Sequence, residues 1–562
     1  HATLRGIVTA PPPARCAAEP RGLEAAVIYE LHVGGFTRDP SSDVRARGTF
    51  AGLIEKIPHL EDLGVTHVEL LPVMAFDEQD VPRGARERGL SNYWGYSTHS
   101  FHSPHPGYCV NPAEGEREFR ALTDALHAAG IGVLLDVAFN HTAEGGTLGP
   151  MINFKGLANE VFYHLDAADK RRYRDYTACG NTVNCNHPMA TAFIVRCLEH
   201  WVEELGVDGF RFDLASVFAR ASDGAIMTDP PLPWAIEFSS ALSGAPLIAE
   251  AWDAAGLYHV GAFPGMAWAE WNGRYRDVVR RFVRGDAGLL GELATRVGGS
   301  ADLYAAGGRL PNNSINFVTC HDGFTLYDLV SYNVKHNEAN GEDNRDGSDH
   351  NLSWNCGAEG DAADSEINAL RERQAKNFLA ILMLSRGVPM LLAGDEVLRT
   401  QRGNNNAYSQ NNAVSWFDWR AVDARREMLR FTRELIALRR RHPSLTANRF
   451  FDGRLVPGRG LPDVRWHGAK LGEPGWHDPN GRLLAFTLTG SGDEEDLHVI
   501  FNMADAGIDV MAPEIPGRRW HVALDSAQPS PHDIVARAKQ KPYAARHYCA
   551  RPRSVVVLEA RA

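Results

Sequence analysis

The chain has 562 residues, and 58 Lys and Arg stand against 70 Asp and Glu, so the formal charge at neutral pH is −12. The chain is mildly acidic and has no block of basic residues that could bind the phosphates of a nucleic acid, so we expect no nucleic-acid partner. Hydrophobic residues at 44% and charged residues at 23% are typical of a globular chain with a large core. No run approaches the roughly 18 consecutive apolar residues of a membrane span and no signal sequence opens the chain, so we expect a soluble protein.

The eight cysteines are scattered and form no CxxC pair. This argues against a zinc cluster and against a disulfide framework. Cys179 and Cys185 are close enough in the sequence to cross-link in an oxidising compartment, but free thiols are the simpler interpretation. We therefore expect a reducing, cytoplasmic location.

Short apolar runs alternate with longer amphipathic segments along most of the chain. Residues 1–22, rich in Pro and Ala, are expected to form a linker. The expected strands lie at 27–33, 66–72, 131–137, 208–213, 246–252, 315–320 and 388–394, and the expected helices at 48–64, 116–130, 189–205, 234–243 and 366–386. A long irregular stretch, rich in Gly, Asn and Asp, covers 142–188, and a sixth strand-helix unit before residue 315 is only weakly marked.

This alternation of strand and helix favours a parallel α/β architecture. We expect a (β/α)8 TIM barrel over 23–450, with residues 142–188 as a long insertion after the third strand. A doubly wound open sheet is the alternative, but Gly34-Gly35 lacks the third glycine and the helix start of a phosphate-binding turn. Short strand-like runs separated by turns predict a small C-terminal antiparallel β-sandwich domain over 451–562.

Polar residues gather where the predicted strands end. They are Asp136 and His141 at the third strand, Arg211 and Asp213 at the fourth, Glu250 at the fifth, and His321 and Asp322 at the seventh. Because the C-terminal ends of barrel strands converge on one mouth, we expect these side chains to meet. Each one alone is better explained as a helix cap, a turn residue or half of a structural ion pair. The whole set is not, because desolvating several unneeded charges at one place is costly.

Two of these carboxyl groups stand in different settings. Alternation along the fourth strand places Arg211 and Asp213 on the same inward face, and a guanidinium beside a carboxylate favours its ionised form. Asp213 is thus suited to be a nucleophile. Glu250 follows an apolar run and precedes Trp252, a less polar setting in which a carboxylic acid keeps its proton. Such a pair is what glycoside hydrolysis requires.

Four stretches carry a resemblance to a known enzyme family. They are DVAFNH (136–141), GFRFD (209–213), AEAW (249–252) and TCHDGF (319–324). In this order and spacing they resemble the α-amylase superfamily of glycoside hydrolases, family 13. IYELHVGGFT (28–37), SNYWGY (91–96), ACGNTVN (178–184), KHNEANGEDNRDG (335–347) and MLLAGDE (390–396) resemble its glycogen debranching enzymes and isoamylases.

The resemblance implies a role for each matched residue. Asp213 looks like the catalytic nucleophile, Glu250 like the general acid and base, and Asp322 like the acid that stabilises the transition state. The residues that resemble the lining of the attacked sugar's subsite are Asp136, His141, Arg211 and His321, with Tyr96 as the aromatic platform beneath the sugar. Trp252 offers a further stacking surface for substrate, although loop packing is its simpler role.

The resemblance implies hydrolysis of α-1,6 branch linkages in glycogen, limit dextrin or an amylopectin-like glucan by a retaining mechanism. Two alternatives stay open: an α-glucanotransferase or branching enzyme on the same barrel, and a non-catalytic glucan-binding subunit. We expect no required cofactor. Asn140 matches a calcium position of many amylases, but the other oxygen ligands are not recognisable, so Ca²⁺ is left open and no metal ligand is predicted. Debranching enzymes of this type usually begin with a β-sandwich carbohydrate-binding module, and this chain starts where such a module would have ended.

Overall fold

A closed barrel of eight parallel strands forms the centre of the molecule. The computed structural model describes residues 21–561, so most of the linker predicted over 1–22 lies outside the described residues. The barrel strands are, in spatial order, β1 (Ile28–Leu31), β2 (His67–Leu70), β5 (Gly132–Val137), β6 (Gly209–Phe212), β7 (Leu247–Ala249), β8 (Ala269–Trp271), β9 (Ser314–Asn316) and β10 (Val388–Leu392). Pairing of β1 with β10 closes the barrel, which confirms the predicted TIM-barrel fold.

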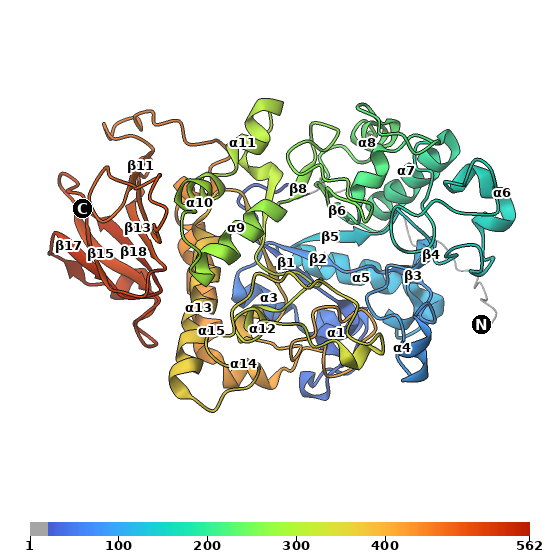
Figure 1. The fold of residues 1–562 in the computed structure, drawn as a ribbon, viewed down its shortest axis with the longest axis horizontal. Helices are drawn as coiled ribbons and strands as arrows, with labels where there is room; N and C mark the ends of the chain where they lie inside the picture. Colours follow the sequence, from blue (N-terminus) through green and yellow to red (C-terminus); the bar gives the residue numbers. More distant parts are fainter. Residues whose placement is uncertain (1–20, 562) are drawn as a thin grey trace.

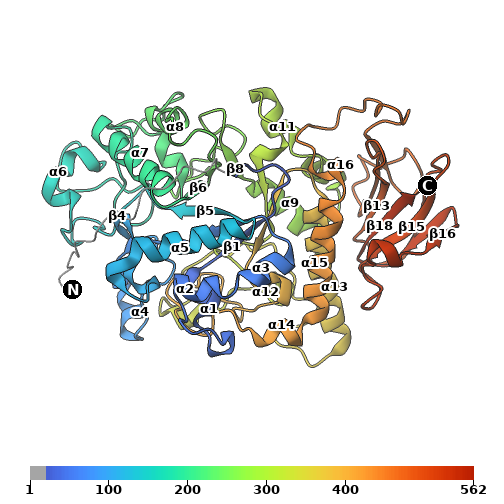
Figure 2. The same cartoon turned by 180° about the vertical axis from the view of Figure 1, so that it is seen from behind.

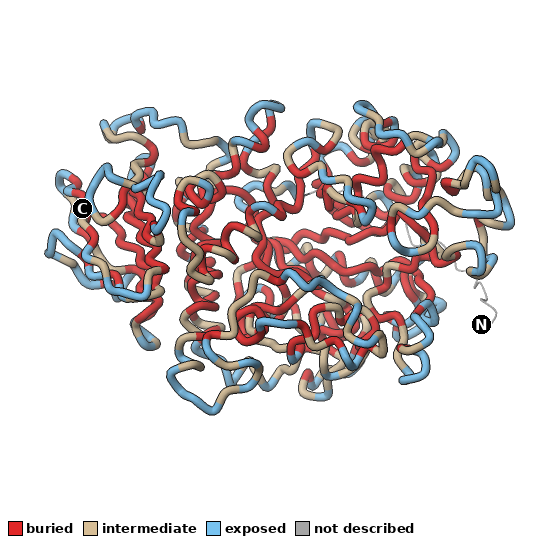
Figure 3. Tube along the Cα trace, in the orientation of Figure 1, coloured by how far each residue is buried: buried red, intermediate tan, exposed pale blue. Residues whose placement is uncertain are grey.

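Every residue of the eight barrel strands is buried, and Figure 3 shows buried trace at the centre of the molecule. In a barrel of this kind side chains fill the interior and helices cover the outside. Six of the barrel strands fall within the strands predicted from apolar runs, and β9 begins one residue before its predicted range of 315–320. The eighth, β8, belongs to the weakly marked unit and has only three residues. The single helix expected over 48–64 is two helices, α2 (Phe50–Ile54) and α3 (Ile57–Leu63). Pro58 stands in the first turn of α3, where its missing N–H breaks no intrahelical bond.

The other helices lie around the barrel and over its ends (Figures 1 and 2). They are α1 (Val33–Arg38), α4 (Arg83–Glu87), α5 (Gly115–Ala128), α6 (Phe154–Phe162), α7 (Pro188–Glu203), α8 (Pro231–Glu237), α9 (Gly273–Arg284), α10 (Leu290–Val297), α11 (Ala301–Tyr304), α12 (Leu326–Leu329), α13 (Ser365–Leu384), α14 (Arg420–Ala424), α15 (Arg426–Arg440) and α16 (Pro443–Thr446). Helix α6 lies within the insertion 142–188, which is otherwise irregular as expected. A two-stranded antiparallel sheet of β3 (Met74–Phe76) and β4 (Thr98–Pro104), which the sequence did not suggest, follows the second barrel strand.

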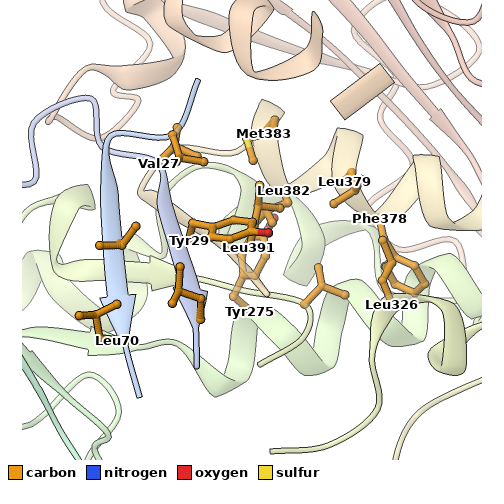
Figure 4. Close-up of a cluster of buried hydrophobic side chains, with 14 of the residues drawn as sticks. Val27, Tyr29, Leu70, Tyr275, Leu326, Phe378, Leu379, Leu382, Met383 and Leu391 are labelled. Atoms are coloured by element: carbon orange, nitrogen blue, oxygen red, sulfur yellow. The ribbon is translucent and has the colours of Figure 1, made fainter. Parts of the chain in front are cut away.

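The apolar core is continuous from the barrel wall to the surrounding helices. Figure 4 shows Tyr29 and Leu391 of neighbouring strands beside Leu382 and Met383 of α13. Each fully buried side chain of this size contributes about 1.5–3 kcal/mol relative to an exposed one. The barrel is therefore a rigid support for side chains that project from its strand ends.

The C-terminal residues form antiparallel sheets. The larger sheet contains, in spatial order, β11 (Val464–His467), β12 (Leu483–Leu488), β13 (Asp496–Asn502), β18 (Ser554–Arg561), β15 (Arg519–Asp525) and β16 (Pro542–Tyr543), and β14 (Ile508–Met511) pairs with β17 (His547–Ala550). Val510 and Tyr548 of the smaller sheet pack on Ile500 and Leu558 of the larger one. Helices α13 and α15 stand between this region and the barrel (Figures 1 and 2). The antiparallel architecture agrees with the prediction, whereas the boundaries 23–450 and 451–562 stay predictions.

Candidate active site

Most of the polar residues predicted to meet at the strand ends do meet there. Asp136 is the next-to-last residue of β5, Arg211 lies on β6, and Asp213 and Glu250 follow β6 and β7 directly. Asp136 and Arg211 are direct register partners on neighbouring strands, which brings the two side chains to the same level inside the barrel. The site thus lies at the ends of the barrel strands and in the first residues of the loops that follow them, where the barrel sets the starting geometry.

The Arg211 guanidinium joins three carboxyl groups. Its Nη1 donates to both Asp136 oxygens at 2.8 Å and to Asp213 Oδ1 at 3.1 Å, and its Nη2 lies 3.0 Å from Glu250 Oε2. Arg211 itself is fully buried. The sequence placed this arginine beside Asp213, and the structure adds that the same group contacts the other two acids.

Glu250 is buried in a setting that favours its neutral form. Burial, together with the nearby charge of Asp213, raises the pKa of Glu250 to about 8, although Arg211 opposes the shift. The Leu214 N–H donates to Glu250 Oε2 at 2.7 Å. Leu214 has φ 41°, a left-handed conformation that is strained for a leucine and that turns this N–H toward the acid. No sequence signal marks Leu214, because its contribution comes from the backbone.

Asp213 is held from two sides. The Asn140 amide donates to Asp213 Oδ2 and to its backbone oxygen, both at 2.8 Å, opposite the contact from Arg211. The Asn140 oxygen in turn lies 2.5 Å from His141 Nδ1. Burial disfavours the charged form of His141, whereas the neighbouring Cys179 sulfur and the Asp213 and Asp80 carboxylates favour it, and together they raise the pKa of His141 to about 9. The surroundings of His141 therefore favour its protonated form beside the proposed nucleophile.

Tyr96 and His321 complete the side of the site that faces Asp136. The Tyr96 hydroxyl lies 2.5 Å from Asp136 Oδ2 and 2.9 Å from His321 Nε2. The Tyr96 and His321 rings are stacked with their centroids 5.4 Å apart. Both side chains therefore lie beside the buried carboxylates of Asp136 and Glu30, and their roles in sugar binding stay predictions.

Asp322 and Trp252 are at the rim. Asp322 is exposed, and among the described residues no hydrogen bond or ion pair joins its carboxylate to Asp213 or Glu250. Its charge acts instead on Arg276 and Arg280. The half-buried Trp252 ring is stacked on Tyr258, with centroids 6.0 Å apart, so loop packing accounts for at least one of its faces.

The residues around Asn140 do not fit a calcium ion, because its side-chain oxygen is engaged by His141 and its amide nitrogen by Asp213. Within residues 21–561, no group of three or more His, Cys, Asp or Glu side chains is arranged to hold a metal ion. In the same part of the chain, no helix has both the length and the apolar character that a membrane crossing requires.

Comparisons with known proteins agree with this architecture. The family of alpha amylase catalytic domains matches residues 36–178, and the family of isoamylase 1-3 C-terminal domains matches residues 465–555. The pullulanase type I of Bacillus subtilis strain 168, solved in complex with maltose, superposes with a TM-score of 0.75 at 23% identity over 99% of this chain and 73% of that one. At this identity the likeness shows the fold alone.

Curated relatives are more similar in sequence. The chloroplastic isoamylase 3 of Oryza sativa subsp. japonica is 44% identical over 95% of this chain and 68% of its own length. The glycogen operon protein GlgX homolog of Mycobacterium tuberculosis (strain H37Rv) is 47% identical over 88% of this chain and 67% of its own. The chain thus spans about two thirds of the length of these relatives. With a strand-end site of paired carboxyl groups on a matching barrel, the chain belongs to the isoamylase group of the α-amylase family of glycoside hydrolases.

Proposed function

We propose that the protein hydrolyses α-1,6 branch linkages in glycogen or related α-glucans by a retaining double displacement. The observation that carries the proposal is the contact of one buried guanidinium with both Asp213 and Glu250. A bridge through a single Arg211 supports the close spacing of the two carboxyl groups that retaining enzymes need. The names of the relatives, isoamylases and glycogen operon proteins, support the branched glucan as substrate.

In the first step, Asp213 attacks the anomeric carbon while Glu250 gives its proton to the departing glycosidic oxygen. The raised pKa of Glu250 keeps that proton available at neutral pH. In the second step, Glu250 takes a proton from water, and the resulting nucleophile releases the sugar from Asp213. Asp136, Arg211, His141 and His321 would orient the sugar that is attacked.

Asp322 keeps its proposed role as the acid that stabilises the transition state, although it stands at the rim. It directly follows His321, whose ring is within reach of Tyr96. Contacts of catalytic groups are often formed only in the substrate complex, so an exposed side chain next to the site is compatible with this role. Trp252 remains a proposed stacking surface on the same grounds.

A cytoplasmic location is likewise a proposal. Every cysteine within residues 21–561 is free, Cys179 and Cys185 included. Free thiols agree with a reducing compartment.

The test is the release of reducing ends from a limit dextrin by the parent protein and by Asp213→Asn. We expect the variant to lose turnover by about 10³-fold or more, because the nucleophile is gone while an amide of the same shape keeps the fold. Asp423→Asn, at an exposed acid of α14, is the matched control and should act like the parent. Near-parental activity of Asp213→Asn would refute the proposal.

The same assay separates the two alternatives. A transferase consumes one α-glucan bond for each it forms, so the parent would produce no net reducing ends. A glucan-binding subunit would be slowed in native gels that contain dextrin and would show no turnover. The first result would favour the transferase and the second the subunit.

A further inference from the structure

Two glutamates are buried side by side inside the barrel, below the catalytic carboxyl groups. Glu30 of β1 and Glu69 of β2 are register partners, and neither has any exposed surface. The inward face of β1 is identified by Ile28, which lies in the apolar cluster that fills the barrel, two residues before Glu30. Isolated carboxyl groups are costly at such depth, so each needs an explanation.

Glu30 is paired with His321 through both of its oxygens. Its Oε1 lies 2.6 Å from His321 Nδ1, and its Oε2 accepts from the His321 backbone N–H at 2.8 Å. These two contacts hold the imidazole ring and the start of the following segment in one orientation. The catalytic steps proposed above do not use Glu30.

The hydrogen-bond pattern on the other side of the ring fixes its protonation. The Tyr96 hydroxyl has a single proton, which it gives to Asp136, because that carboxylate is already an acceptor for Arg211. The Tyr96 oxygen must then accept from His321 Nε2. With Nδ1 donating to Glu30, both ring nitrogens carry a proton, and His321 is an imidazolium.

We propose that Glu30 is a positioning residue that keeps His321 doubly protonated and thereby holds Tyr96 against Asp136 in the sugar subsite. This inference rests on the proposed function for its kinetic consequences, but the protonation of His321 can be observed without substrate. Loss of the Glu30 charge would remove the reason for the Nδ1 proton. The Nε2 proton and the Tyr96 orientation would then no longer be enforced.

The remaining groups around His321 act in both directions. The titratable and charged groups near its ring are Glu30 from β1, Tyr96 from the loop before β4, Asp136 from β5 and Arg211 from β6. The aromatic rings of Trp94 and Trp271 pack against it. A cavity of about 40 Å³ beside His321 is also lined by His32 and Arg399. Burial and the Arg211 charge disfavour the imidazolium, whereas Glu30 and Asp136 favour it, and the net effect raises the pKa of His321. Glu30 is the carboxylate in direct contact with the ring.

Glu69 offers a matched control at the neighbouring position. Neither of its oxygens has a hydrogen-bond partner among the described residues. Burial, together with the charges of Glu30 and Asp136, raises the pKa of Glu69 well above its ordinary value, so this side chain is neutral. Replacement of Glu69 by glutamine changes neither charge nor shape, whereas the same replacement of Glu30 removes a charge.

The experiment compares Glu30→Gln with Glu69→Gln in the full chain. We expect Glu30→Gln to move the alkaline limb of kcat/KM on limit dextrin to lower pH by about one unit or more, as expected when a contacting opposite charge is lost from His321. Glu69→Gln should leave the limb in place. Selective ¹⁵N-histidine NMR without substrate should show the His321 ring doubly protonated at pH 7 in the parent and in Glu69→Gln, but neutral in Glu30→Gln.

Several results would overturn the inference. One is an alkaline limb of kcat/KM that lies at the same pH in Glu30→Gln and in Glu69→Gln. Another is a His321 ring that is neutral in the parent at pH 7. If Glu30→Gln does not fold, Tyr96→Phe replaces it: His321 should stay protonated there because Glu30 is intact, and a neutral ring would contradict the role of Glu30. If the parent releases no reducing ends, the proposed function fails, while the NMR arm still decides the protonation.

Discussion

Replacement of Arg211 by lysine keeps the positive charge and removes the geometry that lets one side chain contact three acids. The guanidinium reaches Asp136, Asp213 and Glu250 at 2.8 to 3.1 Å through two separate nitrogens. A lysine ammonium is a single point on a flexible stem and does not reproduce this planar fork. We expect it to keep one of the three contacts and to lose the other two.

The loss can be converted into a rate. A hydrogen bond to a charged group contributes about 1.5–3 kcal/mol, so two lost contacts amount to about 3–6 kcal/mol. At about 1.36 kcal/mol for each factor of ten, kcat/KM should fall by about two to four powers of ten. Because Arg211 lowers the pKa of Glu250, a weaker contact lets that pKa rise further. The alkaline limb of the rate should therefore move to higher pH, by about one unit for a loss of 1.4 kcal/mol.

The assay is kcat/KM on limit dextrin between pH 5 and 10, with thermal unfolding measured in parallel. Arg439→Lys is the control, because Arg439 is equally buried but donates only to the backbone oxygens of Met383, Ser385 and Gly387. That variant should lose stability and keep the pH profile of the parent. If Arg211→Lys retained kcat/KM within threefold of the parent and its alkaline limb did not move, the reasoning about the shared guanidinium would be wrong.

Three further predictions concern the surroundings of the site. The Lys155 ammonium donates to the backbone oxygens of Glu144 and Gly146, both at 2.6 Å. Lys155→Met should therefore lower the free energy of unfolding by about 1 kcal/mol and speed amide hydrogen exchange over 144–163. Unchanged exchange would contradict this prediction. Hydrogen bonds from His127 and a backbone N–H lower the pKa of Asp208 despite its burial. The ionised Asp208 therefore stabilises the fold above about pH 4, and this effect is lost as the pH falls. In urea unfolding, the free energy of unfolding of Asp208→Asn should fall less on acidification than that of the parent. The exposed Cys179 thiol contacts a site histidine, so iodoacetamide should slow the parent but not Cys179→Ser, and equal inhibition of both would point to another thiol.

The sequence predicts the fold well where an element is long and apolar. Strand β5 is apolar except for Asp136 and was predicted within one residue at its start, whereas β8 has only three residues with Glu270 at their centre and is too short to be recognised. The two-stranded sheet of β3 and β4 was missed because its residues alternate poorly between apolar and polar. Short elements of this kind are held by tertiary contacts, which local patterns do not contain.

For the site, the sequence predicts which residues converge but not how they are paired. Side-chain alternation on β6 was enough to place Arg211 beside Asp213. It could not indicate that Leu214 takes a left-handed conformation and donates to Glu250, since that depends on where the next strand ends. Glu30 was part of a recognised stretch, yet its contact with His321 spans 291 residues of chain and exists only once the barrel closes.

In the proposed reaction a negative charge passes between two neighbouring acids. Burial raises the pKa of Glu250 to about 8, so this acid enters the step neutral. When Asp213 forms a bond to the sugar it loses its negative charge, and when Glu250 gives up its proton it gains one. Since Arg211 contacts both acids, the same guanidinium pairs with the negative charge before and after the step. No net charge then has to be created in a desolvated site, which is the electrostatic condition for a low barrier there.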